Sequence, residues 1–358
     1  MTRHIFPCAL LPRHPTRAAT GVAAALLALV LGSAAAPAAA DQTIRLVGDG
    51  ATFPAPLYLR WFRDYYLAHP QVRVDYQSNG SAGGVQDLIG GRVDFAGSDL
   101  PLTEGQAGQV AGGILQVPMA AGGIVAVYNL EGVPALKLSR DALVGIFSGR
   151  VARWNDPAIA ASNPEASLPD APITVVARAD SSGTTYKFTR HLSAVSDAFA
   201  AEVGTGMMPN WPQLLKGRGG LVRGRGNDGV AASVRAIPGS IGYVQYAFGF
   251  LPGISMATLQ NRAGNFVEPG VAGFDAAMRS SYENRSIENS TDPSGEDAYP
   301  IVGFSWLVVR NEYDDPAKLP ALMEVIDYAM GPGQDVTEQL GYVRFPKPLI
   351  DFVEEQLE

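Results

Sequence analysis

Apolar strand patterns alternate with helical patterns along most of this 358-residue chain, and this alternation constrains its fold more than any other feature. Strands are predicted at residues 72–76, 93–96, 124–128, 173–178, 241–244 and 301–310. Helices are predicted at residues 57–66, 85–89, 182–192 and 319–329, with one more that Ser139 caps. Because no repeat of fixed period accompanies it, the alternation favours an α/β fold with mostly parallel sheet. The Pro-, Gly- and Asn-rich stretches 155–172 and 279–295 are predicted loops.

Residues 1–40 are typical of a secretory signal peptide. Arg3, Arg13 and Arg17 make the start basic, an almost unbroken apolar run covers 18–31, and alanines 38–40 provide a cleavage site before Asp41. The alternative is a retained membrane anchor, but the apolar run is mostly alanine, and a spanning helix needs about 20 strongly apolar residues. We therefore expect export and cleavage.

The length and the single cysteine limit how the exported part is stabilised. A chain longer than about 250–300 residues outgrows a single hydrophobic core, so two lobes are expected. Cys8 precedes the apolar run, so lipid attachment is not expected there, and cleavage removes this cysteine. Disulfides, thiolate metal sites and a cysteine nucleophile are thereby excluded from the exported part.

The charge balance disfavours nucleic acid as a partner. Lys and Arg number 27 and Asp and Glu number 35, which gives a net charge of −8. Cleavage would remove three arginines and no acids, and would make the chain more acidic. Such a protein is a poor general binder of nucleic acid or anionic membrane, but it can still hold one anion where donors are concentrated.

Three short segments share a design that suits anions: a strand ends, a turn of small residues follows, and a helix begins. They are residues 48–54 (GDGATFP), 79–84 (NGSAGG) and 178–185 (RADSSGTT). The start of a helix has unpaired N–H groups and partial positive charge, and glycines let the backbone approach a ligand. Taken singly each is weak evidence, because a Ser or Thr before a helix is usually a plain cap and an arginine such as Arg178 usually pairs on the surface.

The motifs occur together in one order, and this combination is distinctive. GDGATFPAPLY, SNGSAGGV, VDFAGSDLPL and ARADSSGTT are followed by GNDGVAASV, PGSIGYVQYA and GEDAYPI. From about Ile44 to the C-terminus, the chain closely resembles the periplasmic phosphate-binding proteins of high-affinity ABC-type phosphate uptake systems. The resemblance implies binding of inorganic phosphate without reaction, and delivery of phosphate to the membrane subunits of an ABC permease.

The resemblance also assigns ligand contacts to matching residues. It places phosphate donors at Thr52, Phe53 and Ser81, a carboxylate that contacts phosphate at Asp99, and the single cationic ligand at Arg178. Further donors fall on Ser182, Gly183 and Thr184 at the third helix start. Asp180 corresponds to an acid that pairs with Arg178 and orients it. No cofactor, metal or nucleic acid is expected.

The fold that the resemblance implies is a two-lobed, type II-like periplasmic binding protein. Each lobe would be a mixed, mainly parallel sheet flanked by helices, and a hinge would join the lobes. By analogy, residues 41–128 and 300–358 form lobe 1 and residues 129–299 form lobe 2. A monomer is expected, and the closed form would dock to the permease.

Asp99 gives the predicted site a means of selecting phosphate. Phosphate carries protons near neutral pH and sulfate carries none, so an ionised carboxylate accepts a hydrogen bond from the first and repels the second. The alternative for Asp99 is a turn or cap residue, since it follows Gly97 and Ser98.

Rival functions stay open at this point. One is a secreted phosphatase with Ser182 as nucleophile, although no general base is evident and only His69 and His191 would survive processing. Another is a binder of a different oxyanion, such as sulfate, tungstate or a phosphorylated metabolite. Residues 213–225 depart from the family pattern because they are longer and more basic; we interpret them as a solvated loop, or alternatively as a basic patch that steers phosphate or contacts a partner.

Overall fold

The computed structural model describes residues 43–217, 220–283 and 291–355. The predicted signal peptide, residues 1–40, lies outside this part of the chain. Within these ranges no helix combines the length and the apolar character needed to cross a membrane.

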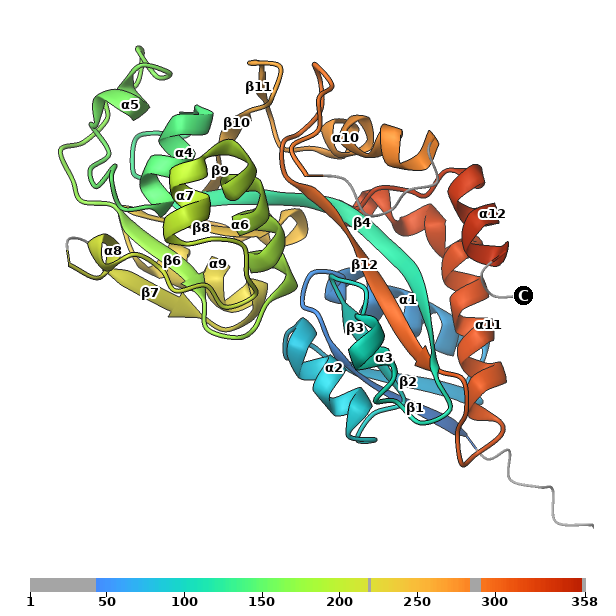
Figure 1. The fold of residues 1–358 in the computed structure, drawn as a ribbon. Coiled ribbons are helices and arrows are strands. Elements are labelled where there is room, and N and C mark those ends of the chain that lie inside the picture. The colour runs from blue at the N-terminus through green and yellow to red at the C-terminus, as the bar shows by residue number, and fades with distance from the viewer. Residues whose placement is uncertain (1–42, 218–219, 284–290, 356–358) are drawn as a thin grey trace, which may run out of the picture. The chain divides into compact units, whose positions relative to one another are not determined.

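Strands and helices alternate through the described part (Figure 1). The strands are β1 (Ile44–Gly50), β2 (Val72–Gln77), β3 (Phe95–Ser98), β4 (Ile114–Asn129), β5 (Lys137–Leu138), β6 (Thr174–Arg178), β7 (Leu221–Gly224), β8 (Ser240–Gln245), β9 (Ser255–Met256), β10 (Thr258–Gln260), β11 (Phe266–Val267) and β12 (Val302–Arg310). The α-helices are α1 (Ala55–Ala68), α2 (Ser81–Ile89), α3 (Glu104–Ala107), α4 (Arg140–Phe147), α5 (Pro157–Ala160), α6 (Gly183–Val195), α7 (Asp197–Glu202), α8 (Gln213–Gly217), α9 (Gly226–Ala236), α10 (Val271–Glu283), α11 (Lys318–Met330) and α12 (Lys347–Glu355). Short 3₁₀ helices follow at Tyr246–Phe250, Pro332–Val336 and Glu338–Leu340.

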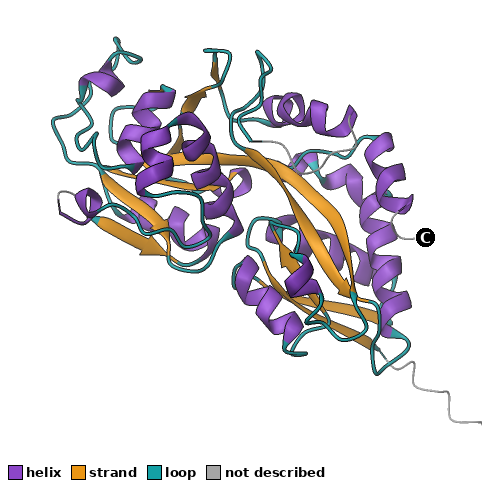
Figure 2. Ribbon diagram, in the orientation of Figure 1, coloured by secondary structure: helices purple, strands orange, loops and turns teal. Residues whose placement is uncertain are grey.

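The main sheet is mixed and runs in the order β2-β1-β3-β12-β4-β8-β6-β7, with β9 also paired to β4. At one end β1 pairs in parallel with β2 and β3, and at the other β6 pairs in parallel with β7 and β8. The antiparallel pair of β12 and β4 joins the two parallel groups. Helices lie against both groups (Figure 2), which confirms the predicted α/β class.

The long strand β4 belongs to both parts of this sheet (Figure 1). Its partner along Ile114–Gly123 is β12, and along Ile124–Asn129 it is β8. The sequence predicted only residues 124–128, because Pro118 and the pair Gly122-Gly123 interrupt the strand pattern. Gly123 is required by packing, since a Cβ atom there would lie 2.1 Å from the ring of Phe274.

Helix α1 shows how an amphipathic stripe builds the core. Its buried side chains recur at helical spacing and pack toward the sheet: Ala55, Leu57, Tyr58, Trp61, Phe62 and Tyr65. The indole N–H of Trp61 donates to the carbonyl oxygen of Gly333 at 2.7 Å. Tyr66, which the sequence placed in the same stripe, is 42% exposed, so that part of the prediction was wrong.

Two predicted loops contain regular structure. Helix α10 extends to Glu283, so the predicted loop 279–295 starts too early, and residues 284–290 lie outside the described part. The predicted loop 213–225 contains α8 and the edge strand β7, which pairs in parallel with β6. A five-residue helix and a four-residue strand among glycines and arginines are too short to give a periodic pattern, which explains the error. Residues 155–172 are irregular apart from the single turn of α5.

Candidate anion-binding site

The three predicted anion segments converge in the structure. A Cβ atom on Gly183, at the start of α6, would lie 2.3 Å from Cβ of Asp99 and 2.6 Å from Oγ of Ser81. A Cβ atom on Gly80 would lie 2.5 Å from Oδ2 of Asp180. The glycines therefore allow the second and third segments to meet at backbone distance.

Thr52 and Phe53 in the first segment are held by residues from distant parts of the chain. Oγ1 of Thr52 accepts hydrogen bonds from the backbone N–H of Asn227 at 3.3 Å and from its side-chain amide at 2.8 Å. The carbonyl oxygen of Phe53 accepts a hydrogen bond from the hydroxyl of Tyr342 at 2.6 Å. Because Asn227 lies in the first turn of α9, these bonds connect the first segment to yet another helix start.

Arg178 ends β6 inside the protein with its guanidinium only partly satisfied. Nε donates to Oδ1 of Asp180 at 2.9 Å and Nη2 donates to Oδ2 of the same carboxylate. Nη1 is buried and has no hydrogen-bond partner in the described part of the chain. A buried cationic donor without a partner is unfavourable, so this geometry leaves one donor nitrogen for a ligand.

Asp180 orients the guanidinium and also contacts a neighbouring helix. Oδ1 accepts a hydrogen bond from the backbone N–H of Gly226 at 2.9 Å. Burial acts to raise the pKa of Asp180, but the hydrogen bonds and charge of Arg178 and the Gly226 N–H outweigh it and lower the pKa below its ordinary value. The carboxylate therefore stays ionised and keeps Arg178 in one orientation.

Asp99 is a buried carboxylate and caps no helix. Oδ1 accepts a hydrogen bond from the hydroxyl of Ser305 at 2.9 Å, and Oδ2 accepts a long one from Thr184 at 3.5 Å. Its backbone N–H donates to Oγ of Ser81 at 3.2 Å. These contacts bring together the second segment, the third segment and strand β12 around one carboxylate.

Burial raises the pKa of Asp99 above its ordinary value. The positive charges of Lys187 and Arg178 and the hydrogen bonds from Ser305 and Thr184 oppose this rise. The site thus holds a carboxylate whose ionised form is stabilised by two cations and two hydroxyl donors.

Helix α6 presents its N-terminus to the same place. Oγ of Ser182 accepts the N–H of Thr185 at 3.1 Å, so Ser182 is a helix cap, and its own hydroxyl hydrogen is still available to a ligand. First-turn N–H groups, here those of Gly183 and Thr184, have no acceptor within the helix and carry partial positive charge.

The structure adds residues that the sequence reasoning did not assign. Asn227 lies in the motif GNDGVAASV, which was noticed without a role for its asparagine. Ser305 is a buried hydroxyl in the otherwise apolar strand β12, and such an isolated polar residue was an available signal. No sequence pattern marked Lys187. Arg225, from the basic stretch, donates through Nη2 to Oδ1 of Asn79 at 2.8 Å, so this stretch reaches the edge of the site.

Comparison with known proteins gives a consistent result. Residues 33–332 match the PBP superfamily domain. A relative named phosphate-binding protein PstS from Xylella fastidiosa (strain 9a5c) is 37% identical over 330 residues, covering 90% of this chain and 88% of its own. A PstS protein from Pasteurella multocida (strain Pm70) is 38% identical over 337 residues, covering 93% and 94%.

The solved structures agree on the fold. A high-affinity periplasmic phosphate-binding protein with bound phosphate has a TM-score of 0.69 at 23% identity, and the match covers 87% of this chain and 93% of that one. This similarity confirms the predicted two-lobed binding-protein fold.

Proposed function

The chain belongs to the PBP superfamily and to the phosphate-binding protein family of these relatives, and we propose that it binds inorganic phosphate in the periplasm for an ABC-type permease. The observation that carries this proposal is the buried Nη1 of Arg178, which lacks a partner while Nε and Nη2 are held by Asp180. An oxyanion oxygen is the acceptor that this nitrogen requires.

The proposed ligand shell consists of the convergent donors around that nitrogen and one acceptor. It contains Thr52, Phe53, Ser81, Asp99, Arg178, Ser182, Gly183 and Thr184, with Asp180 behind Arg178. Charge-assisted hydrogen bonds contribute about 1.5–3 kcal/mol each, so several of them in a buried site can outweigh the negative charge of the protein as a whole.

Within this proposal, Asp99 accounts for the preferential binding of phosphate over sulfate. Its ionised carboxylate would accept a hydrogen bond from a protonated phosphate oxygen. Sulfate offers no proton, so it would meet an uncompensated negative charge in a buried place. The same carboxylate argues against fully ionised oxyanions as the physiological ligand.

The location and the lobe division are part of the proposal. Residues 1–40 would be removed on export. Residues 41–128 and 300–358 would form lobe 1 and residues 129–299 lobe 2, with the crossing strands β4 and β12 as the hinge. The ligand-bound monomer would then dock to the permease subunits.

The contacts of Ser182 favour a role in ligand binding over a role as a catalytic nucleophile. Its hydroxyl oxygen is engaged as a helix cap, and none of its contacts in the described residues is with a histidine. A secreted phosphatase would need a general base there. Release of phosphate from a chromogenic phosphate ester by the purified protein would contradict this reading.

Substitution of Arg178, the residue on which the proposal rests, tests the proposal. Arg178→Ala should weaken phosphate binding by at least about 2 kcal/mol, because a buried charge-assisted contact is lost. Calorimetric titration of ligand-free protein measures this change. Arg45→Ala removes an exposed arginine, paired only with Asp75, and serves as the matched control with unchanged affinity. Wild-type affinity in Arg178→Ala would remove Arg178 from the site.

A further inference from the structure

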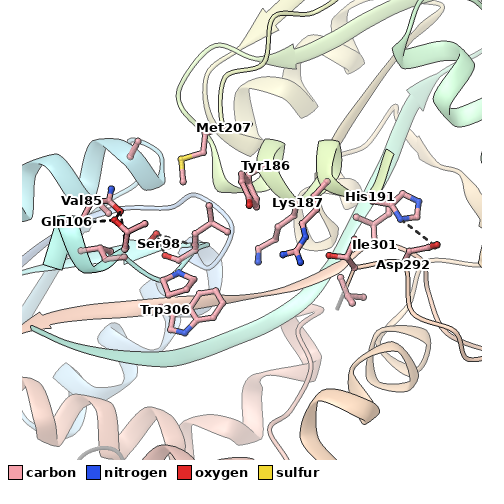
Figure 3. A pocket seen from close by; sticks show the side chains of 18 of the residues that line it. Val85, Ser98, Gln106, Tyr186, Lys187, His191, Met207, Asp292, Ile301 and Trp306 are labelled. Carbon is pink, nitrogen blue, oxygen red and sulfur yellow. Dashed lines mark hydrogen bonds and ion pairs between the residues drawn. The ribbon is translucent and has the colours of Figure 1, made fainter. Parts of the chain in front are cut away.

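A cavity of about 540 Å³ borders the proposed phosphate site without containing any of its ligands. Ser98, the chain neighbour of Asp99, lies on one wall (Figure 3), and Ala82, the chain neighbour of Ser81, also lines the cavity. Tyr186, Lys187 and His191 of α6 line the facing wall. The cavity is several times larger than an inorganic oxyanion needs and falls in the range of about 300–1,000 Å³ typical of small-molecule sites.

Two cations, Lys187 and Arg190, lie on the α6 wall, and the charge of Lys187 also acts on the buried carboxylate of Asp99. Lys187 and Arg190 are three residues apart and both line the cavity. Among the residues that the structure describes, neither lies within 4.0 Å of a carboxylate oxygen. Burial lowers the pKa of Lys187 to about 8; the charge of Asp99 opposes this shift and the charge of Arg190 adds to it. Two like charges at a cavity wall are unfavourable unless an anion is held between them.

The carboxylate on the cavity wall is already occupied. Asp292 accepts hydrogen bonds at both oxygens from Arg140, at 2.6 and 2.8 Å. Nδ1 of His191 is buried without a hydrogen-bond partner, although it lies 3.8 Å from Oδ1 of Asp292. The polar groups of this wall thus favour a negatively charged occupant.

Apolar side chains line the cavity opposite α6, beside the polar residues Ser98, Thr103 and Gln106. The ammonium of Lys187 lies 5.3 Å from the ring centroid of Trp306, which forms part of the lining. Residues 100–102, Leu-Pro-Leu, continue this surface from the other side of the cavity. An occupant that matches both walls has an anionic head and an apolar, preferably aromatic, body.

We propose that this cavity is a second ligand site, which takes a small organic anion with its head on Lys187 and Arg190 and its apolar body on Trp306. The site is distinct from the phosphate cradle, so both can be filled at the same time. The inference goes beyond phosphate binding and does not depend on it.

The probe for the test is 8-anilinonaphthalene-1-sulfonate, which joins a sulfonate to an aromatic body, and its neutral counterpart is N-phenyl-1-naphthylamine. Fluorescence titration of the exported chain should show saturable one-to-one binding of the sulfonate. Saturating phosphate should leave this binding in place. Absence of saturable binding, or displacement of the sulfonate by phosphate, would overturn the proposal, and displacement would show that the probe occupies the cradle.

Matched variants distinguish the contribution of the probe's anionic head group to binding from that of its apolar body. Arg190→Gln should weaken the sulfonate by about tenfold or more while the neutral counterpart is unaffected. Arg262→Gln removes an exposed arginine and gives the same change in net charge, so it should leave both probes unaffected. Circular dichroism and thermal unfolding of Arg190→Gln report whether the variant is folded, whatever its affinity for phosphate. Equal sulfonate affinity in wild type and in folded Arg190→Gln would refute the site.

Discussion

Arg178 and Asp99 carry opposite charges in the same buried place, and each has an energetic role of its own. The guanidinium is satisfied at Nε and Nη2 by Asp180 and keeps Nη1 for a ligand. The carboxylate of Asp99 is stabilised by Ser305, Thr184 and two cations, yet burial still raises its pKa. The proposed ligand recognition would therefore use groups that are costly to bury when the ligand is absent.

The free-energy cost of burying the ionised carboxylate of Asp99 leads to a prediction about the stability of the protein. Because the pKa of Asp99 is raised in the folded protein, the protonated form of Asp99 stabilises the fold relative to the ionised form. This stabilisation is fully present below the ordinary pKa of 3.8 and is lost as the pH rises through the raised pKa. Asp99→Asn, which stays neutral, should therefore raise the free energy of unfolding of ligand-free protein at pH 7. The gain should shrink as pH falls toward 4. Chemical unfolding at several pH values measures it.

The same variant tests the proton-reading role of Asp99. Asp99→Asn should narrow the preference for phosphate over sulfate, because the amide no longer repels sulfate and can donate to it. Competition titration with both anions gives the ratio of affinities. An unaltered ratio would show that selectivity arises elsewhere.

At the scale of elements, the site depends on a close approach between the start of α6 and the turn after β3. Gly183 is the contact point, since its missing Cβ leaves room for Asp99 and Ser81. Gly183→Ala should weaken phosphate binding by about tenfold or more, because the segments must separate to accommodate the methyl group. Gly270→Ala is the control, as nothing lies within 4 Å of its Cβ position. Equal affinities in both variants would mean that the segments do not close on the ligand.

The sequence could predict helices and strands that have a long, regular apolar pattern. It could also predict functional segments that carry a local motif. The helix 57–66 and the strand 301–310 correspond to α1 and β12 because their apolar spacing is regular. The three anion segments were found because strand, glycine turn and helix start are local signals. Thr52, Ser81, Arg178 and their neighbours were then assigned from the family resemblance.

The parts of the fold and of the site that the sequence did not predict depend on packing between distant segments. Residues 114–123 of β4 were missed because Gly122 and Gly123 break the strand pattern, although Phe274 requires Gly123. The contacts of Asn227 with Thr52 and of Ser305 with Asp99 join residues 175 and 206 positions apart. No local pattern reports such pairs, and the cavity beside α6 was missed for the same reason.

At the scale of the whole molecule, an acidic chain is proposed to bind an anion through buried local donors. The net charge is −8, while the proposed ligand groups Arg178, Asp99 and Thr184 are at most 3% exposed. Buried charges are screened much less by salt than exposed ones. Raising sodium chloride from about 0.05 to about 0.5 M should therefore change the phosphate affinity by less than about threefold. A steep loss of affinity with salt would indicate an exposed site instead.

Calorimetric titration of ligand-free protein with phosphate and then with sulfate tests the central claim most directly. The proposed cradle predicts saturable one-to-one binding of phosphate and no measurable binding of sulfate. Equal binding of the two anions would retain the cradle and contradict the role of Asp99. Absence of binding to either anion, in protein shown to be folded and free of ligand, would contradict the proposed function.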